Sequence, residues 1–294
     1  MVKYVKISLL FVISCFGLFY AFKSIELAEL LGHLYSVNLF KFSISILILI
    51  VACIIRAKRL KYLALPIDKS ISTHHLFGAT MIGYFGNGIL FFRLGEVLKA
   101  YAISQGRKIK PSESFGLIML ERLVDAVSVF FLLIIVLPFL PLDDKMIRYW
   151  IIAFILVTLS LISVLVILSF LDWRYLINHL EFLNETLREK IAYIIEKIYD
   201  GLGLVFKTKK KIEILSCTIL IWICYFLMTK WLIESCHIKL SSFDSFILLI
   251  LGAIIISVPA LPGGLGTYEA GITYAFTYLF LVSKDVALSY AIVS

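Results

Sequence analysis

The chain has 294 residues, of which 61% are hydrophobic and 16% are charged, and its mean hydropathy is +1.00. This composition excludes an ordinary soluble domain, because the apolar surface exceeds what one core could bury. The net charge of +8 could suggest a nucleic-acid partner. The basic residues, however, gather in short loops between apolar runs, as the positive-inside rule requires. The sequence therefore predicts an all-α polytopic membrane protein that binds no nucleic acid.

Apolar runs long enough to cross a bilayer follow one another along the chain. The first has Lys3 and Lys6 beside it and no small-residue cleavage site after it, so it predicts a transmembrane helix rather than a signal peptide. The same lysines predict a cytoplasmic N-terminus in a cytoplasmic-membrane protein. The clear spans cover residues 5–22, 42–60, 115–140, 149–171 and 212–235.

Residues 74–104 lie between two basic segments that we expect in the cytoplasm. One segment contains Arg56, Lys58, Arg59, Lys61 and Lys69, and the other contains Arg107, Lys108 and Lys110. Two full crossings of the bilayer would need about 40 residues, which is more than this stretch provides. It therefore predicts a re-entrant hairpin that reaches the middle of the membrane.

The segment 172–211 is rich in lysine and arginine, with leucine and isoleucine at helical spacing. This pattern indicates amphipathic helices on the inner leaflet. A soluble helical hairpin beneath the membrane bundle fits the pattern equally well. Either interpretation keeps the segment cytoplasmic.

A second broken region covers residues 246–283 and contains SVPALPGGLGTYEAG, whose prolines and glycines interrupt any continuous helix. It predicts another re-entrant hairpin. The elements then repeat as span, span, re-entrant hairpin and span in residues 1–140 and in 149–294, from opposite sides of the membrane. The prediction is a single membrane domain, residues 1–294, built as an inverted repeat with Gly/Pro-broken helices. The final span begins near residue 286 and is too short to cross, which favours a shortened chain over one that continues naturally.

The span 115–140 carries Glu121, Arg122 and Asp125 near its start. At 1.5 Å per residue, Glu121 lies about 10 Å and Asp125 about 16 Å inside the membrane. Each charge at the centre of a span costs roughly 2.5–3.5 kcal/mol, so such side chains turn inward, pair and usually line a polar cavity. The first hairpin supplies Arg93, Glu96 and Lys99 as partners, and Glu269 adds a fourth acid near the second hairpin.

Two interpretations of these charges remain open. They could form an ion-pair network that only fastens the hairpin to the span, although buried ion pairs often stabilise no better than apolar packing. Alternatively, they could bind an anionic head group, helped by the glycine amides of PGGLG. The glycines could also be simple helix breakers. The five cysteines lack CxxC spacing, and adjacent His74 and His75 cannot bind one metal from a helix, so we expect no metal and no cofactor.

Three short motifs resemble signature elements of the lysylphosphatidylglycerol synthase transmembrane family. They are FRLGE at 92–96 followed by Lys99, ERLVD at 121–125, and PGGLGTYE at 262–269. The resemblance implies a lipid-translocating domain related to the flippase half of the multiple peptide resistance factor. The implied substrate site comprises Arg93, Glu96, Lys99, Glu121, Arg122, Asp125, Gly263, Gly264, Gly266 and Glu269.

The soluble aminoacyl-transferring domain of the two-part relatives is missing from this sequence, so we do not expect lysine transfer. A flippase for an anionic or polyprenyl-linked lipid is the favoured function, with a lipid-modifying or glycosyl-transferring enzyme as a further partner. The alternatives are a membrane-embedded enzyme acting on a lipid phosphate and an accessory membrane subunit. Broken helices and charges within the membrane favour transport.

Overall fold

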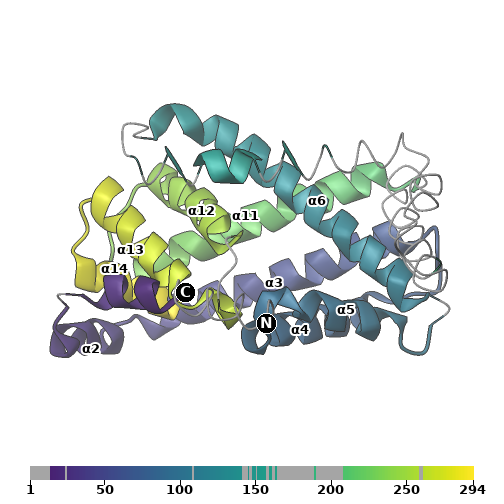
Figure 1. Ribbon diagram of the computed structural model, residues 1–294, viewed down its shortest axis with the longest axis horizontal. Helices are drawn as coiled ribbons and strands as arrows, with labels where there is room; N and C mark the ends of the chain where they lie inside the picture. Colours follow the sequence, from purple (N-terminus) through teal and green to yellow (C-terminus); the bar gives the residue numbers. More distant parts are fainter. Residues whose placement is uncertain are drawn as a thin grey trace.

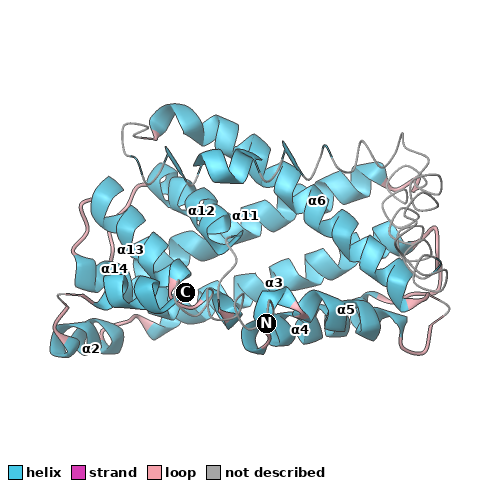
Figure 2. Ribbon diagram, in the orientation of Figure 1, coloured by secondary structure: helices cyan, strands magenta, loops and turns pink. Residues whose placement is uncertain are grey.

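The computed structural model describes residues 14–23, 25–107, 109–140, 208–257 and 261–294, with a few positions between 145 and 189 (Figure 1). This part of the chain consists of helices joined by turns, and no strand occurs in it (Figure 2). The predicted all-α fold is confirmed for these residues. The amphipathic segment up to residue 207, apart from Glu189, and much of the span 149–171 lie outside the described residues.

The elements are long apolar helices and shorter helices separated by 3-10 turns. In chain order they are α2 (Leu27–Tyr35), α3 (Leu39–Ala64), α4 (Thr73–Ile89), η1 (Phe91–Arg93), α5 (Gly95–Ser104), α6 (Pro111–Val136), η2 (Leu137–Phe139), α11 (Lys211–Ser235), α12 (Ser242–Ser257), η3 (Pro262–Gly264), α13 (Thr267–Leu279) and α14 (Lys284–Val293).

Helices α3, α6 and α11 are long and apolar enough to cross a membrane. A helix of 26 residues, the length of α3, measures about 39 Å and so exceeds the roughly 30 Å hydrocarbon core. Phe40, Phe131 and Leu215 project from these helices with more than half of their surface exposed, as side chains in contact with lipid would. The chain is therefore a membrane protein, and these helices match the predicted spans 42–60, 115–140 and 212–235.

Helices α4 and α5 form a tightly packed helical hairpin in place of one continuous helix. Helix α4 is about 25 Å long and α5 about 15 Å, so neither spans the hydrocarbon core alone. Glycines let the two backbones touch: a Cβ added to Gly95 would lie 2.2 Å from the carbonyl oxygen of Gly83 and 2.4 Å from the amide nitrogen of Asn87. The break between the helices is the 3-10 turn η1, at the position of the predicted hairpin.

The second broken region has a comparable construction. Helix α12 ends at Ser257, the turn η3 begins at Pro262, and α13 begins at Thr267. Gly263, Gly264 and Gly266 have φ angles of 73°, 79° and 87°, which a side chain would disfavour. Gly266 also lies against the helix of residues 14–22, since a Cβ there would be 2.1 Å from the Ser14 carbonyl oxygen.

The turns that interrupt the two broken regions, η1 and η3, lie next to each other. Turn η3 contacts both α4 and η1, although the two segments are far apart in the sequence. Helices α3 and α11, which run along the long axis of the molecule, form the most extensive helix pair (Figure 1). The two broken regions thus meet beside this central pair.

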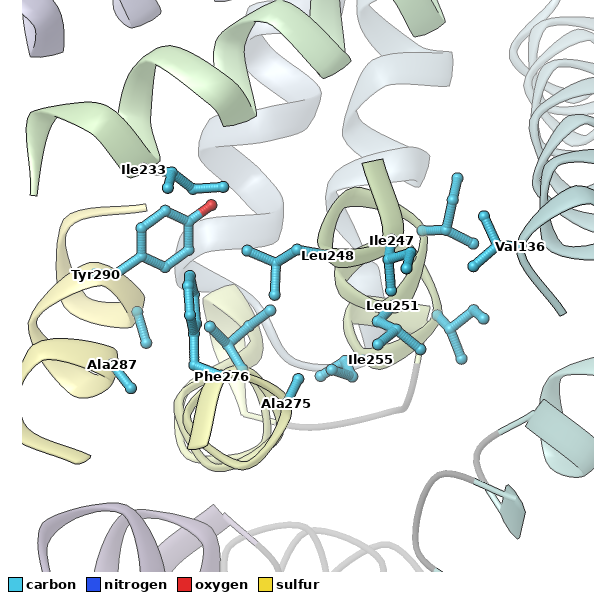
Figure 3. Close-up of a cluster of buried hydrophobic side chains, with 14 of the residues drawn as sticks. Val136, Ile233, Ile247, Leu248, Leu251, Ile255, Ala275, Phe276, Ala287 and Tyr290 are labelled. Carbon is cyan, nitrogen blue, oxygen red and sulfur yellow. The ribbon is translucent and has the colours of Figure 1, made fainter. Parts of the chain in front are cut away.

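Two apolar cores hold the described helices together. One joins α11, α12, α13 and α14, where Leu248 lies near Phe276 and Tyr290, and Leu251 lies near Ile247 and Ile255 (Figure 3). The other joins α3, α4, α5 and α6 through small and branched side chains such as Ala57, Ala100 and Leu117. Charged residues on the facing sides of α3, α5 and α6 continue this second core.

Replacing Gly95 with alanine should destabilise the α4–α5 hairpin, because the added methyl group overlaps backbone atoms that cannot move independently. Overpacking of this kind costs about 1–3 kcal/mol, or several degrees in Tm. Gly88→Ala in α4 is the matched control, since its Cβ meets no described atom within 4 Å. Thermal unfolding in detergent measures both. Equal Tm values for the two variants would contradict the close packing.

Candidate functional site

A cluster of ionisable side chains lies where α3, α5 and α6 meet. On α6, a buried stripe of Ser114, Leu117 and Ile118 leads at helical spacing to the buried Glu121, and Asp125 follows one turn later. The helix thus turns its acids toward α3 and α5. We call the ion-paired group the charged cluster; its members are Arg56, Arg59, Glu96, Lys99, Glu121, Arg122 and Asp125.

Asp125 is held by two arginines of α3. Its Oδ2 accepts from Arg56 Nη2 at 2.5 Å, and its Oδ1 accepts from Arg59 Nη2 at 2.7 Å. Their Nη1 atoms are also engaged, because Arg56 Nη1 donates to the Tyr84 hydroxyl at 2.6 Å and Arg59 Nη1 to Thr218 Oγ1 at 3.3 Å. Both carboxylate oxygens of Asp125 are therefore used to fix the arginines, which in turn contact α4 and α11. The Nε atoms of both arginines are buried and have no hydrogen-bond partner among the described residues.

Glu121 lies at the centre of the charged cluster and is fully buried. Lys99 Nζ donates to its Oε2 at 2.7 Å. Its Oε1 lies 3.3 Å from Arg56 Nε, 3.7 Å from Arg59 Nη2 and 3.4 Å from Arg122 Nη2. One carboxylate thus contacts four cations, which come from three helices.

Arg122 is the most loosely held cation of the charged cluster. Its nitrogens lie 3.5 Å from Glu96, 3.4 Å from Glu121 and 3.7 Å from Asp125, longer than the best contacts of the other cations. Its side chain is 28% exposed, compared with 7% for Arg56 and 2% for Lys99. Because the charged cluster contains four cations and three acids, it has a formal charge of +1, and Arg122 is where this surplus is accessible.

Unpaired polar atoms lie beside Arg122. Asn87 Nδ2 donates to Glu96 Oε1 at 3.4 Å. By contrast, Glu96 Oε2, Asn87 Oδ1 and Arg122 Nε are buried and have no hydrogen-bond partner among the described residues. Buried polar groups without partners are costly, and each calls for an explanation such as a ligand or a water molecule. Because Arg56 Nε and Arg59 Nε on the α3 side are unpaired as well, the exposure of Arg122 and its long ion-pair distances are what distinguish this side of the charged cluster.

The predicted site residue Arg93 lies at the hairpin turn and makes a different contact. It has a left-handed backbone with φ of 55°, which is uncommon outside glycine. Its guanidinium donates to the carbonyl oxygen of Ile256 near the end of α12. Arg93 therefore joins the first hairpin to the second broken region, and among the described residues it forms no ion pair with an acid of the charged cluster.

The predicted residues of the PGGLG region mainly shape their own turn. The amide of Gly266 donates to Glu269 Oε2 at 2.6 Å, so Glu269 caps the first turn of its own helix α13. The amide of Gly264 donates to the carbonyl oxygen of Leu261 at 2.9 Å. Two of the three glycine amides considered as anion ligands are thus already in use, and Gly263 is the exposed one.

Sequence reasoning missed Arg56 and Arg59. Assigning both to a cytoplasmic loop was wrong, because α3 continues to Ala64 and buries both side chains. They are three residues apart, on the same helical face as the buried residues Ala52 and Leu63, whereas the intervening Lys58 is exposed. This periodicity was the available signal. The positive-inside rule alone cannot separate a buried arginine from a loop lysine.

Metal binding finds no support in the described residues, where no three His, Cys, Asp or Glu side chains could hold one ion. The fold and the charged cluster define a helical membrane protein with a buried ionic centre. The chain belongs to the family described as the lysylphosphatidylglycerol synthase TM region, whose model matches residues 7–294. Searches of curated proteins and of solved structures found no match.

Asp125→Asn should destabilise the protein strongly, because it leaves Arg56 and Arg59 without their shared carboxylate. Removing one partner of a buried ion pair costs about 3–5 kcal/mol. The matched control is Glu234→Gln, which breaks the half-exposed pair with Lys41 at 2.9 Å and should cost at most about 1 kcal/mol. Tm in detergent measures both. An Asp125→Asn variant as stable as the control would contradict a structural role for this pair.

Proposed function

We propose that the protein is a transporter that moves an anionic or polyprenyl-linked lipid across the cytoplasmic membrane. The phosphate of the head group would bind at Arg122, while the acyl or prenyl chains stay in the bilayer. The observation that carries this proposal is the surplus cation of the charged cluster. If the charged cluster served only to hold helices together, we would expect its acids and bases to neutralise one another. Instead its formal charge is +1, and Arg122 is loosely paired and partly exposed.

The position of Arg122 along its helix supports a site within the membrane. It lies eleven residues after Pro111, the first residue of α6, and therefore about 17 Å along a helix that can span the bilayer. A phosphate at that depth is out of reach of bulk water, so a fixed cation is the natural partner for it. Glu96 and Asn87 lie beside it with unused acceptor oxygens for the rest of the head group.

The two broken regions support movement of the lipid past this site. We infer that both are re-entrant hairpins and that residues 1–140 and 149–294 are the halves of an inverted repeat. In support, the described helices α3–α6 and α11–α14 each comprise a long helix, two helices joined through a break, and a further helix. Transporters with such repeats alternate access by rocking one half against the other. Arg93 would link the two breaks in the state described here, and release of Ile256 would free its guanidinium to meet the phosphate.

The arrangement of the carboxylates argues against chemistry on the lipid. An enzyme acting on a lipid phosphate would use Glu121 and Asp125 to bind magnesium or to activate a nucleophile. Both oxygens of Asp125 accept from arginine, and Glu121 is enclosed by four cations. We therefore propose transport without modification of the lipid, in a protein with a cytoplasmic N-terminus.

Arg122→Gln should abolish translocation while preserving the fold, since glutamine keeps hydrogen bonding and removes the charge. Losing a hydrogen bond to a charged group costs about 1.5–3 kcal/mol, so translocation should fall at least tenfold. The assay is transfer of labelled phosphatidylglycerol by purified protein in vesicles, with mass spectrometry of the lipid and Tm on the same preparation.

Lys41→Gln is the matched control, because it removes a cation from an ion pair that lies outside the charged cluster. It should translocate as the wild type does. Wild-type transfer by Arg122→Gln would contradict the proposed site. A chemically altered lipid would favour an enzyme instead.

A further inference from the structure

The charged cluster has a formal charge of +1, and its four basic side chains differ in how readily they release a proton. Arg56, Arg59 and Arg122 keep their protons at any physiological pH. Adding a proton to one of the acids would increase the positive charge. Within the charged cluster, therefore, only Lys99 can bring the total to zero by releasing a proton.

The surroundings of Lys99 suit an amine that changes its charge. Its side chain is 2% exposed, and its stem packs closely on Gly83, where an added Cβ would lie 3.0 Å from the Lys99 Cβ. Its Nζ donates one hydrogen bond, to Glu121 Oε2, among the described residues. An ammonium carries three donors, whereas a neutral amine needs fewer partners. Glu121 does not depend on Lys99 for neutrality, because three arginines also contact it.

Lys99 lies near one carboxylate, Glu121, and two guanidinium groups, Arg56 and Arg122. The charged and titratable groups that act on it are Cys53 and Arg56 on α3 and Glu121 and Arg122 on α6. Tyr84, Asp125 and Glu96 contact these arginines, and Arg59 contacts Glu121 and Asp125. With Lys99 protonated, these side chains leave one positive charge uncompensated. A buried net charge is unfavourable in a membrane, and an anion at Arg122 would compensate it.

We propose that binding of an anionic head group at Arg122 is coupled to uptake of one proton at Lys99. In the empty site Lys99 is a neutral amine and the charged cluster sums to zero. When the anion binds, the lone pair of the amine takes up one proton, which a buffer acid in the surrounding solution releases as it becomes its conjugate base, and the sum returns to zero. This coupling rests on the proposed function, and a carrier with this property moves one proton with each monoanionic lipid, so that transport responds to a pH gradient.

Calorimetry on the purified protein tests the coupling directly. The probe is dihexanoyl phosphatidylglycerol, a short-chain phosphodiester whose own charge does not change near neutral pH. Titration in two buffers with different ionisation enthalpies gives the number of protons exchanged. We expect uptake of about one proton per bound lipid, and affinity that falls by up to about tenfold per pH unit as pH rises.

Variants of Lys99 test whether this side chain is the group that takes up the proton. Lys99→Arg should bind the probe with no proton uptake, because a guanidinium stays charged in both states. Lys41→Arg, outside the charged cluster, should retain the uptake. If Lys99→Arg does not fold, Lys99→Met serves instead and should bind at least tenfold more weakly, also without uptake.

The outcomes separate the coupling from the proposed function. Binding by the wild type without proton uptake would overturn the coupling and leave the anion site intact. Proton uptake that persists in a Lys99 variant would assign the proton to another group and overturn the role of Lys99. Absence of any binding to the wild type would overturn the proposed function, and the coupling with it.

Discussion

The contact between Glu121 and the four basic side chains around it is the interaction on which the rest of the structure depends. A carboxylate with no exposed surface cannot remain charged inside a membrane protein unless nearby cations replace its hydration. Here the cations come from α3, α5 and α6, so the same contacts that neutralise Glu121 also bring these helices together. The hydrogen bond from Arg59 to Thr218 extends the connection to α11. Apolar side chains of α3, α4, α5 and α6 pack together beside this ionic centre.

The charged cluster has a tight side and a loose side, and the two sides suit different roles. On the tight side, Arg56 and Arg59 each donate a hydrogen bond to one carboxylate oxygen of Asp125. Removing any one of these three side chains would leave an unpaired buried charge. On the loose side, Arg122 makes long contacts next to the unpaired oxygens of Glu96 and Asn87. Unpaired buried nitrogens occur on the tight side too, at Arg56 Nε and Arg59 Nε, so exposure and ion-pair distance are what set Arg122 apart. This difference is the basis on which we propose an anion site at Arg122.

Much of the fold could be predicted from the sequence, because long apolar runs and proline or glycine breaks act locally. The inward-facing acids of ERLVD followed from their cost in lipid. The cap of α13 by Glu269 was also readable, since it lies three residues after Gly266. The hydrogen bond from Arg93 to Ile256 could not be predicted, because every residue has a backbone carbonyl and the sequence does not show which one lies near Arg93. The burial of Arg56 and Arg59 was not predicted, because a basic residue at the end of a span can lie either in a loop or on the buried face of the helix. The inverted repeat remains a prediction.

The central claim is that Arg122 holds the phosphate of a membrane lipid. Native mass spectrometry of the protein released from gentle detergent measures this by counting phosphatidylglycerol molecules that stay bound. The account predicts one tightly held lipid on the wild type and on Lys41→Gln, and its loss from Arg122→Gln. Retention of the same lipid by Arg122→Gln would contradict the claim.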